Sequence, residues 1–357
     1  MKSIYLPLHD GKAPYWLLNR MKKLAKPIIT LIIEEFGEKE FFKRISDPIF
    51  FQSFSNVLGF DWNSSGSTTV LIGVLKSVLN TEEFEIRVAG GKGINALKTP
   101  EEIKAFADEL NVDAERLIEV SRLTAKIDNS ALQDGYEIYH HAIIFSKRHW
   151  TVIQQGMNIH AKMARRYHWE VYSSEPKIEN PHSGIVAVKK ECEVVNLVSD
   201  RSRDARYVML DIVRDGSFRR DYSKLLSVVK FRNGISVPKR LDWKALEKAY
   251  ELQPERFEDL LLIKGMGKGT LRALALIADL IYNTEYDKQD PAKFCFALGG
   301  KDGVPFPVNR RIYDEVIAFM RSVIEQSRLG DFEKKKLLLK ISERVRERAS
   351  SRSGSRL

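Results

Sequence analysis

Apolar residues recur at helical spacing through the first third of the chain, which predicts a series of helices there. In the first helix the apolar positions are Trp16, Leu17, Met21, Leu24, Ile28, Ile32 and Phe36. Gly37 is placed to end this helix and to begin another. Hydroxyl residues before the apolar stretch 70–79 are typical of a helix N-cap. Thr99-Pro100 has the pattern of a further helix start with Thr99 as the N-cap, and two helices are then expected to reach Ile127.

Short runs of apolar and β-branched residues predict strands in the middle of the chain. Tyr136 to Phe145 and Trp150 to Gln155 are two such runs, and the polar residues 146–149 between them predict a β-hairpin. Because side chains alternate along a strand, His140 and His141 are expected on opposite faces of this hairpin. Further strands are expected at residues 84–89, 185–188 and 194–198.

Helical patterns resume after the β-hairpin. Residues 158–167 predict a helix that carries Arg165 and Arg166, and residues 200–215 predict another. Near the end of the chain, a long amphipathic helix is expected at 310–329 and a basic helix at 331–349.

The stretch from Phe257 to Tyr282 combines two apolar helical patterns with a glycine-rich turn. Glycines permit a very tight turn, and without a Cβ atom they allow a ligand to approach the backbone. Backbone N–H groups at the start of the second helix favour an anion, and the lysines and arginine nearby add positive charge. The other interpretation is a turn between two core helices without a ligand. The candidate binding residues are Lys264, Gly265, Gly267, Lys268, Gly269, Thr270 and Arg272.

These elements together predict an α/β (α+β) N-terminal domain followed by an all-α domain. The first domain is expected at residues 1–215, with a small antiparallel sheet that contains the β-hairpin. The second is expected at 216–349 and contains the glycine-rich turn. The Ser- and Arg-rich end, 350–357, is predicted to be disordered.

Composition narrows the function classes. The 357 residues carry a net charge of +10, which suits a polyanionic partner. Two cysteines without metal-ligand spacing argue against a disulfide framework and a structural zinc site. The sequence has no apolar run of membrane-spanning length and no long apolar segment near its start, so a cytoplasmic protein without a membrane partner is expected. Abundant Lys, Arg and Glu fit a thermophile.

Polar and ionisable residues are concentrated between residues 128 and 168. Five of the seven histidines lie between His140 and His168. Polar side chains among apolar neighbours need partners, so the cluster is either a buried polar network or an active site. The candidate catalytic residues are Asp128, Asp134, Glu137, His140, His141, Gln154, Gln155, Arg165, Arg166 and His168.

The residue types in this cluster point to metal-assisted chemistry on a phosphate. The carboxylates Asp128, Asp134 and Glu137 are candidate ligands of Mg²⁺ or Mn²⁺, which prefer oxygen. The two adjacent histidines are candidates for a general acid, a general base or a further ligand, and the two glutamines for positioning a water or the phosphate. The two adjacent arginines are candidates for bidentate phosphate binding.

A second glycine-rich stretch follows the strand expected at 84–89. Gly90, Gly91, Lys92 and Gly93 form a candidate phosphate loop, since a strand followed by such a nest can hold phosphate. A surface turn is the equal alternative.

The glycine-rich turn after Ile263 resembles the helix-hairpin-helix motif of DNA repair and recombination proteins, which binds the nucleic-acid backbone without reading sequence. Some proteins with this motif are base-excision glycosylases, in which an aspartate follows the motif. Counting along the chain reaches Asp287, and Asp290 lies close by. The better local match, just before the helix expected at 310–329, has Asn309 at that position. An amide cannot act as a base, so the resemblance to glycosylases is incomplete.

The chain as a whole resembles domain-of-unknown-function family 763 of archaeal and bacterial proteins, a family that brings no activity to transfer. The resemblance rests on segments spread along almost the whole sequence. They are 6–14, 59–62, 89–93, 133–136, 139–141, 154–158, 164–169 and 296–308.

The leading hypothesis is a DNA nuclease of repair or recombination, with a catalytic N-terminal domain that uses Mg²⁺ or Mn²⁺ and a C-terminal domain that binds DNA. One alternative is a DNA glycosylase or lyase that uses Asp287 or Asp290. Another is a non-enzymatic DNA- or RNA-binding adaptor whose histidine-rich region is structural. Self-association into a homodimer is left open.

Overall fold

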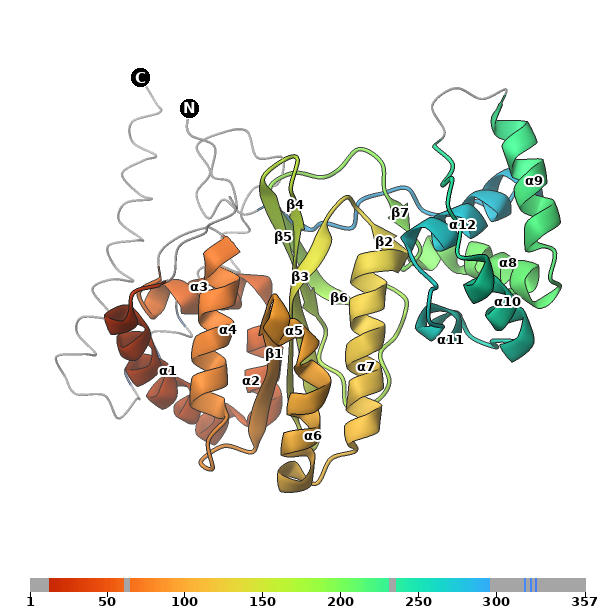
Figure 1. The fold of residues 1–357 in the computed structure, drawn as a ribbon. Helices are drawn as coiled ribbons and strands as arrows, with labels where there is room; N and C mark the ends of the chain where they lie inside the picture. Colours follow the sequence, from red (N-terminus) through yellow and green to blue (C-terminus); the bar gives the residue numbers. More distant parts are fainter. Residues whose placement is uncertain are drawn as a thin grey trace, which may run out of the picture.

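The computed structural model describes residues 13–60, 65–230 and 236–295, together with Ala318, Ser322 and Glu325 (Figure 1). The phosphate-loop, polar-cluster and glycine-turn candidates all fall within these ranges. Asn309, the expected basic helix and the C-terminal tail lie outside the described residues, as does most of the helix expected at 310–329.

A β-sheet covered by helices on both faces forms the centre of the fold (Figure 1). One layer consists of α1 (Tyr15–Phe36), α2 (Glu38–Ser46), α3 (Pro48–Val57) and α4 (Ser65–Leu79). The opposite face is covered by α6 (Thr99–Leu110) and α7 (Ala114–Lys126), while the short α5 (Ile94–Leu97) follows the first strand directly. The π-helical turn η1 (Ile127–Ala131) continues α7 toward the sheet.

The strands of this sheet follow the order β1-β3-β4-β5-β6-β8. They are β1 (Ile86–Lys92), β3 (Glu137–Ser146), β4 (Trp150–Asn158), β5 (Met163–Trp169), β6 (His182–Ala187) and β8 (Phe294–Cys295). Neighbours from β1 to β6 pair antiparallel, whereas β8 pairs parallel with β6. A separate two-stranded sheet pairs β2 (Leu132–Gln133) with β7 (Val195–Asn196). The chain therefore returns from the C-terminal helices to the edge of the main sheet.

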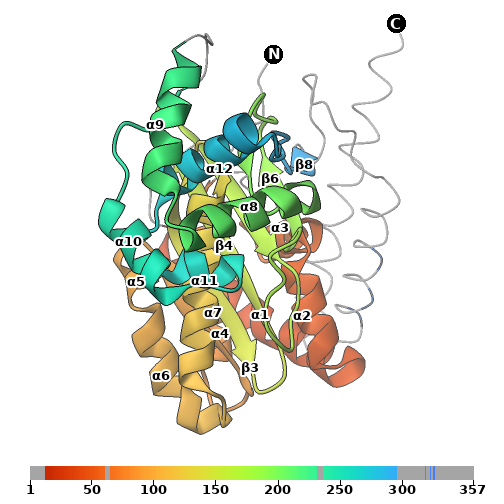
Figure 2. The ribbon, with the colours of Figure 1, turned by 90° about the vertical axis from the view of Figure 1, so that its right-hand side faces the viewer.

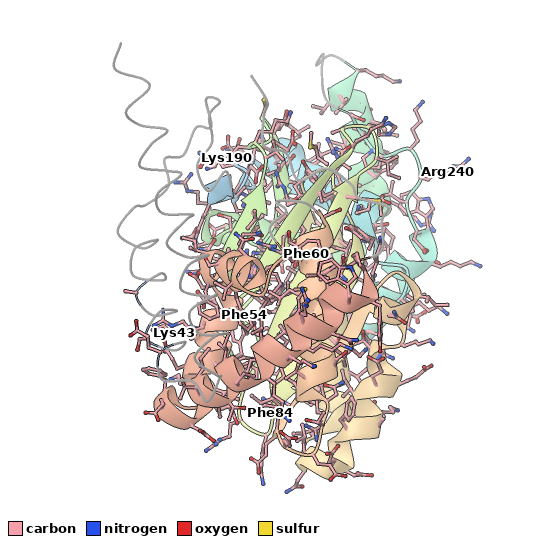
Figure 3. The ribbon with its side chains drawn as sticks, turned by 90° about the vertical axis from the view of Figure 1, so that its left-hand side faces the viewer. Lys43, Phe54, Phe60, Phe84, Lys190 and Arg240 are labelled. Carbon is pink, nitrogen blue, oxygen red and sulfur yellow. The ribbon has the colours of Figure 1, made fainter. Side chains whose placement is uncertain are left out.

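Side-chain alternation divides the buried residues between two hydrophobic clusters, one on each face. On β3, Ala142 and Ile144 face α1–α4, while Ile143 and Phe145 face α6 and α7. Figure 3 looks onto the α1–α4 side, where Phe54 and Phe84 belong to the first cluster. Because helices cover both faces, the middle strands are buried almost throughout and show no simple alternation of apolar and polar residues.

In the described residues up to 295, the α-helices α8 to α12 follow α7 (Figures 1 and 2). They are α8 (Arg203–Arg214), preceded by the 3₁₀ turn η2 (Asp200–Ser202), α9 (Phe218–Val229), α10 (Trp243–Leu252), α11 (Phe257–Leu262) and α12 (Lys268–Tyr282). Their buried residues join the same hydrophobic cluster as those of α6 and α7. The boundary at residue 215 stays a prediction. Within the described ranges, no helix is both long enough and apolar enough to cross a membrane.

Most of the predicted elements are confirmed. Gly37, at φ +84°, separates α1 from α2, and the β-hairpin of β3 and β4 forms as expected. The start of α6 differs by one residue, because Lys98 is its N-cap and Thr99 is already helical. The Thr99 hydroxyl donates instead to the carbonyl oxygen of Ala96, at 2.7 Å.

The helix predicted at residues 158–167 is wrong, because β5 occupies this part of the chain. A turn precedes the strand: the Asn158 side chain accepts from the Ala161 N–H at 2.9 Å, and Lys162 has a φ of +55°. The charged residues that indicated a helix surface are buried on both faces of the sheet and bonded to other side chains. Their polarity therefore reflects partners distant in sequence.

Substitution of Gly90 tests how closely β1 and β3 pack against each other. Its φ is +98°, and a Cβ added there would lie 2.2 Å from the carbonyl oxygen of His141. We expect Gly90→Ala to lower the free energy of unfolding by about 3 kcal/mol or more. Gly73, exposed within α4, has no atom within 4 Å of an added Cβ, so Gly73→Ala should raise it by about 0.5–1 kcal/mol. Urea unfolding of both variants measures this, and equal stability would contradict the close packing at Gly90.

Candidate functional site

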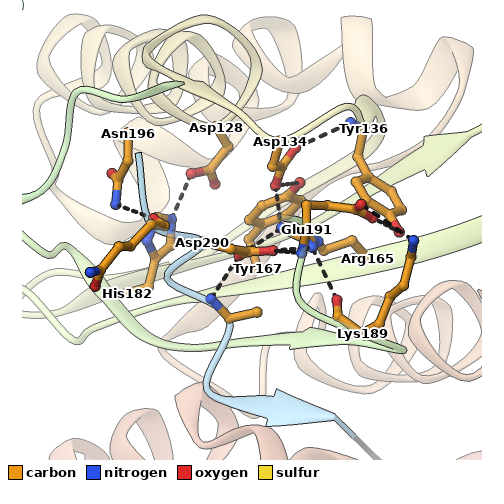
Figure 4. A network of polar contacts seen from close by, with 12 residues as sticks. Asp128, Asp134, Tyr136, Arg165, Tyr167, His182, Lys189, Glu191, Asn196 and Asp290 are labelled. Atoms are coloured by element: carbon orange, nitrogen blue, oxygen red, sulfur yellow. Dashed lines mark hydrogen bonds and ion pairs between the residues drawn. The ribbon is translucent and has the colours of Figure 1, made fainter. Parts of the chain in front are cut away.

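Asp128 lies in η1, where its carboxylate is fully buried against the sheet. Its Oδ2 accepts hydrogen bonds from Gln154 Nε2 at 2.5 Å and from Trp169 Nε1 at 2.8 Å. Its Oδ1 lies 2.6 Å from His182 Nε2 (Figure 4). These partners belong to β4, β5 and β6, so one carboxylate ties the end of α7 to three neighbouring strands.

Gln154 extends this network toward α7. Its Oε1 lies 2.9 Å from His141 Nδ1, and His141 Nε2 lies 2.8 Å from Ser121 Oγ. Because Gln154 donates through Nε2 to Asp128, its Oε1 accepts, which places the His141 proton on Nδ1. His141 Nε2 then accepts from the Ser121 hydroxyl. Ser121 and His141 thus have the geometry of a nucleophile and a base, but they are only 4% and 5% exposed, which favours a structural role.

Asp134 and Asp290 share the buried guanidinium of Arg165 (Figure 4). Arg165 NH1 lies 2.9 Å from Asp134 Oδ2, and NH2 lies 2.7 Å from Asp290 Oδ2. Tyr167 donates to the same Asp134 oxygen at 2.7 Å. Burial opposes the charge on Arg165, but Asp134, Tyr167 and Asp290 more than offset it and raise its pKa. Removing one partner from such a pair typically costs about 3–5 kcal/mol.

The three carboxylates predicted to hold Mg²⁺ or Mn²⁺ have different environments. Asp128 is bonded to Gln154, Trp169 and His182, while Asp134 pairs with Arg165. Glu137 is exposed, 3.5 Å from Lys268 Nζ. No group of three or more His, Cys, Asp or Glu side chains in the described ranges is placed to hold a metal. A metal site stays a prediction from the sequence.

The other predicted catalytic residues lie on the α1–α4 face of the sheet. His140, Gln155 and Arg166 are directly opposite one another on β3, β4 and β5. Gln155 accepts from the Thr68 hydroxyl at 2.5 Å and donates to the carbonyl oxygen of Ser65 at 2.9 Å. The row therefore runs beneath the first turn of α4.

The predicted alternation along β3 is correct for the two histidines but not for the strand start. His141 bonds to Gln154 on the α7 face, whereas His140 pairs with Gln155 on the other. A bulge between Ile138 and His140 changes the phase, so that Ile138 packs on the α7 side while the Tyr139 hydroxyl reaches Gln155.

Arg165 and Arg166 are adjacent on a strand and therefore point to opposite faces of the sheet. Arg165 reaches Asp134 on the α7 side, and Arg166 reaches Gln52 of α3 on the other. The prediction that the two arginines bind one phosphate together is wrong, because the sheet separates them.

Three buried histidines have lowered pKa values. Burial lowers the pKa of His140 to about 3, aided by His141, Lys92 and Lys76. Burial also lowers the pKa of His141, and lowers that of His168 well below its ordinary value, with Arg166 contributing. All three are therefore neutral at pH 7, which fits packing against apolar neighbours better than proton transfer there.

The candidate phosphate loop is largely part of the sheet. Gly90, Gly91 and Lys92 pair with Ala142, His141 and His140 of β3. The Gly90 N–H donates to Glu102 Oε2 at 2.6 Å, and the Gly93 N–H donates to the carbonyl oxygen of Tyr139 at 2.8 Å. Those two backbone donors are thus already used within the protein.

The glycine-rich turn connects α11 to α12, and we call this unit the α11–α12 hairpin. Gly265 is exposed with a φ of +92°, and Met266 is fully buried beneath the turn. Gly267 is the N-cap of α12, at a φ of −116°, and no side chain caps the helix. An added Cβ at Gly267 would meet only the carbonyl oxygen of Gly265, at 3.8 Å. Gly267 therefore has a φ that any residue adopts, whereas Gly265 has the conformation that needs glycine.

The α11–α12 hairpin is anchored to the end of α7. Lys126 Nζ donates to the carbonyl oxygen of Met266 at 2.9 Å, and Gln133 Nε2 donates to that of Lys268 at 2.9 Å. Burial lowers the pKa of Lys126. Two carbonyl acceptors of the turn are thus bonded by Lys126 and Gln133, while Lys264 and Gly265 are exposed.

Charged residues surround the exposed side of the hairpin. Lys239 and Arg240 are exposed, and Figure 3 shows Arg240 at the periphery of the molecule. Asp242 opposes them: an added Cβ at Gly265 would lie 2.5 Å from its Oδ2, while its Oδ1 caps α10 by accepting from the Ala245 N–H at 3.0 Å. Among the other candidates, Thr270 is buried, with its hydroxyl accepting from the Asp242 N–H at 3.1 Å, and Arg272 is half-buried.

Several residues of these networks escaped the sequence prediction. Trp169 and His182 bond to Asp128, and Gln52 and Thr68 contact Arg166. They come from four different elements and share no local motif. The usable signal was the polarity of Gln52, which follows an apolar run and requires a partner when buried, whereas Thr68 lies in a hydroxyl-rich stretch that indicated an N-cap.

The buried histidines predict a loss of stability in acid. In the unfolded chain His140, His141 and His168 take up protons near pH 6.5, whereas in the folded chain they resist protonation. Their contribution is fully present above pH 6.5 and is lost as the pH falls from there toward about 3. Each histidine should lower the free energy of unfolding by up to about 1.4 kcal/mol per pH unit in this window. Urea unfolding between pH 7 and pH 5 measures the slope.

Two variants separate this effect from general acid denaturation. His140→Leu removes one of the histidines that take up a proton on unfolding, so the slope of the free energy of unfolding against pH should fall by up to about 1.4 kcal/mol per pH unit. The substitution breaks no hydrogen bond, because His140 has no hydrogen-bond partner. His160 is exposed, and His160→Gln should leave the slope unchanged. A parent slope of zero above pH 5 would contradict the neutral buried histidines.

The sequence was compared with family models, curated proteins and solved structures, and one family model matches. A model of the family described as "Protein of unknown function (DUF763)" matches residues 2–308, which confirms the family expected from the sequence resemblance. No curated protein matches the chain, and no solved structure does. The chain therefore belongs to the DUF763 family.

Proposed function

We propose that this protein binds the sugar–phosphate backbone of DNA through the α11–α12 hairpin, without reading base sequence. The observation that carries the proposal is the turn itself, where α12 begins without a side-chain cap beside the exposed residues Lys264 and Gly265. The resemblance of this stretch to the helix-hairpin-helix motif leads to the same ligand.

The start of α12 supplies donors for a phosphate. The first N–H groups of an α-helix have no partner within the helix, and the helix dipole adds positive potential there. Gly267 as the N-cap leaves room for an anion to approach. Gly269 is needed for packing instead, since an added Cβ would lie 3.2 Å from the carbonyl oxygen of Arg240.

Charge and rigidity support the same proposal. Lys239, Arg240 and Lys264 are exposed near the turn, and the net charge of +10 favours a polyanion. The bonds from Lys126 and Gln133 fix the hairpin before a ligand arrives. A turn that is already ordered loses little conformational entropy on binding.

The proposal is limited to binding, because the carboxylates Asp128, Asp134 and Asp290 on the α7 side of the sheet are buried and bonded to groups of the protein. Asp290, a candidate for a glycosylase, accepts from both terminal nitrogens of Arg165 and from the N–H groups of Glu191 and Ala292. This arrangement favours the adaptor hypothesis with a structural histidine-rich region. Cleavage of DNA with Mg²⁺ or Mn²⁺ stays a prediction, which incubation with nicked, branched and single-stranded DNA tests.

Gly267→Val tests the hairpin. The ordinary φ at this position predicts a folded variant, while the branched side chain covers the start of α12. We expect its affinity for duplex DNA to fall about tenfold at about 0.1 M salt, equally for two unrelated sequences. Fluorescence anisotropy with labelled duplexes measures the affinity, and circular dichroism checks the fold. If the folded variant binds like the parent, the hairpin is only a core turn.

The matched control compares two exposed lysines. Lys264→Ala should weaken binding and reduce the slope of log affinity against log salt by about one unit, because one phosphate contact is lost. Lys43, exposed on α2 on the other side of the sheet (Figure 3), carries the same charge, and Lys43→Ala should leave the slope unchanged. Equal effects would indicate a response to net charge alone.

Asp242→Asn is expected to change DNA affinity in the opposite direction, by raising it. Asparagine keeps the N-cap of α10, but it removes a negative charge next to Gly265. We expect DNA affinity to rise about two- to fivefold at low salt, with unchanged thermal stability. Anisotropy titrations at two salt concentrations measure this. A drop in affinity would show that the phosphate does not approach this side of the turn.

A further inference from the structure

We propose that Arg166 is the centre of a buried site for a phosphate group, on the α1–α4 face of the sheet beneath the N-terminus of α4. This site lies on the opposite face of the sheet from the α11–α12 hairpin and does not depend on the proposed function. Arg166 carries a buried positive charge that has no negative partner among the described residues.

The guanidinium of Arg166 is poorly satisfied. Arg166 is 1% exposed, and its NH1 and NH2 lie 3.4 Å from Gln52 Oε1. NH1 also lies 3.4 Å from Thr68 Oγ1, while Nε has no hydrogen-bond partner. No carboxylate in the described part of the chain forms an ion pair with it, and burial alone lowers its pKa to about 9.

The preceding residue, Arg165, is also a buried arginine, but carboxylates compensate its positive charge. It bonds to two carboxylates at 2.7–3.0 Å, whereas Arg166 has three contacts at 3.4 Å, all to neutral oxygens. An unpaired buried ion costs several kcal/mol. The Phe51 ring, 4.7 Å from Arg166 Cζ, offsets only part of this through a cation–π contact. An anion bound at Arg166 would supply the missing charge.

The surroundings of Arg166 are suited to an oxyanion. Thr68 belongs to the first turns of α4, whose dipole directs positive potential toward the sheet at this end. His168, two residues along β5, faces the same side, and its Phe51 contact places it beside Arg166. Each of these groups is neutral or cationic, so none of the described residues that contact Arg166 would repel an anion.

The arrangement of donors favours phosphate over a carboxylate. Arg166 Nε has no hydrogen-bond partner, and the Thr68 hydroxyl, 3.4 Å from Arg166 NH1, could become a second donor by turning away from Gln155 Oε1, to which it donates at 2.5 Å. Donors on two sides match the tetrahedral oxygens of a phosphate, whereas a planar carboxylate uses one edge of the guanidinium. The ligand proposed is therefore a single phosphoryl group, free or at the end of a small phosphomonoester.

Thermal unfolding with inorganic phosphate tests the site. We expect about 10 mM phosphate to raise the unfolding temperature of the parent above that in sodium chloride of equal ionic strength. Acetate should not do so, and AMP would match phosphate if the site accepts a phosphomonoester. Calorimetric titration then gives the dissociation constant. A parent that responds equally to phosphate, acetate and chloride would overturn the proposal.

Arg166→Met supplies the decisive variant. Without phosphate it should be as stable as the parent or more stable, because an uncompensated charge is replaced by an apolar side chain of similar length. With phosphate, its affinity should be at least about 100-fold weaker. Equal phosphate binding by Arg166→Met and the parent would also overturn the proposal. Thr68→Val, which keeps the side-chain shape, should weaken phosphate binding about tenfold and gives a second reading if Arg166→Met fails to fold.

Arg206→Gln is the matched control. Arg206 is also buried, but it is paired with Glu179 at 2.6 Å and bonds to two carbonyl oxygens. Arg206→Gln should therefore lower stability and leave the response to phosphate unchanged. If it abolished that response as Arg166→Met does, the response would report general destabilisation and the proposal would fail.

Discussion

The buried carboxylate of Asp128 is the interaction on which the arrangement of helices and strands depends. A charge at this depth is tolerable only when donors surround it, and here the donors come from three adjacent strands. The π-helical turn η1 brings the carboxylate to the sheet at the end of α7. Asp134, six residues later, is a second buried carboxylate, and it accepts hydrogen bonds from Arg165 and Tyr167. The position of α7 is thus set by hydrogen bonds as well as by apolar packing.

The same constraint positions the proposed DNA-binding unit. Lys126 is the last residue of α7, and Gln133 follows η1, so the two anchors of the α11–α12 hairpin flank Asp128 in the chain. The sheet therefore acts as a support for the hairpin through one short segment. In this interpretation, the polar residues of the α7 face hold the molecule together, and contact with nucleic acid falls to the periphery.

The local sequence pattern predicted helices and strands correctly where the packing of the fold agreed with it. The break at Gly37, the β3–β4 hairpin and the α11–α12 hairpin each follow from short-range signals such as glycine, turn residues and apolar spacing. The strand β5 could not be predicted in this way, because its arginines and His168 are buried by partners more than a hundred residues away or on other layers. The polar cluster was recognised as a cluster, but its division between two faces required the sheet order.

The side chains of β5 also determine how this strand aligns with its neighbours. Arg165, Tyr167 and Trp169 present three donors in succession to Asp134 and Asp128. The tandem arginines alone would tolerate a slip by one residue, since either could meet Asp134. The rest of the strand would not: Glu170 would replace Trp169 opposite the Asp128 carboxylate, and two like charges would meet in the core. The aromatic donors Tyr167 and Trp169 thus fix the pairing register of β5, which the two arginines alone would leave undetermined.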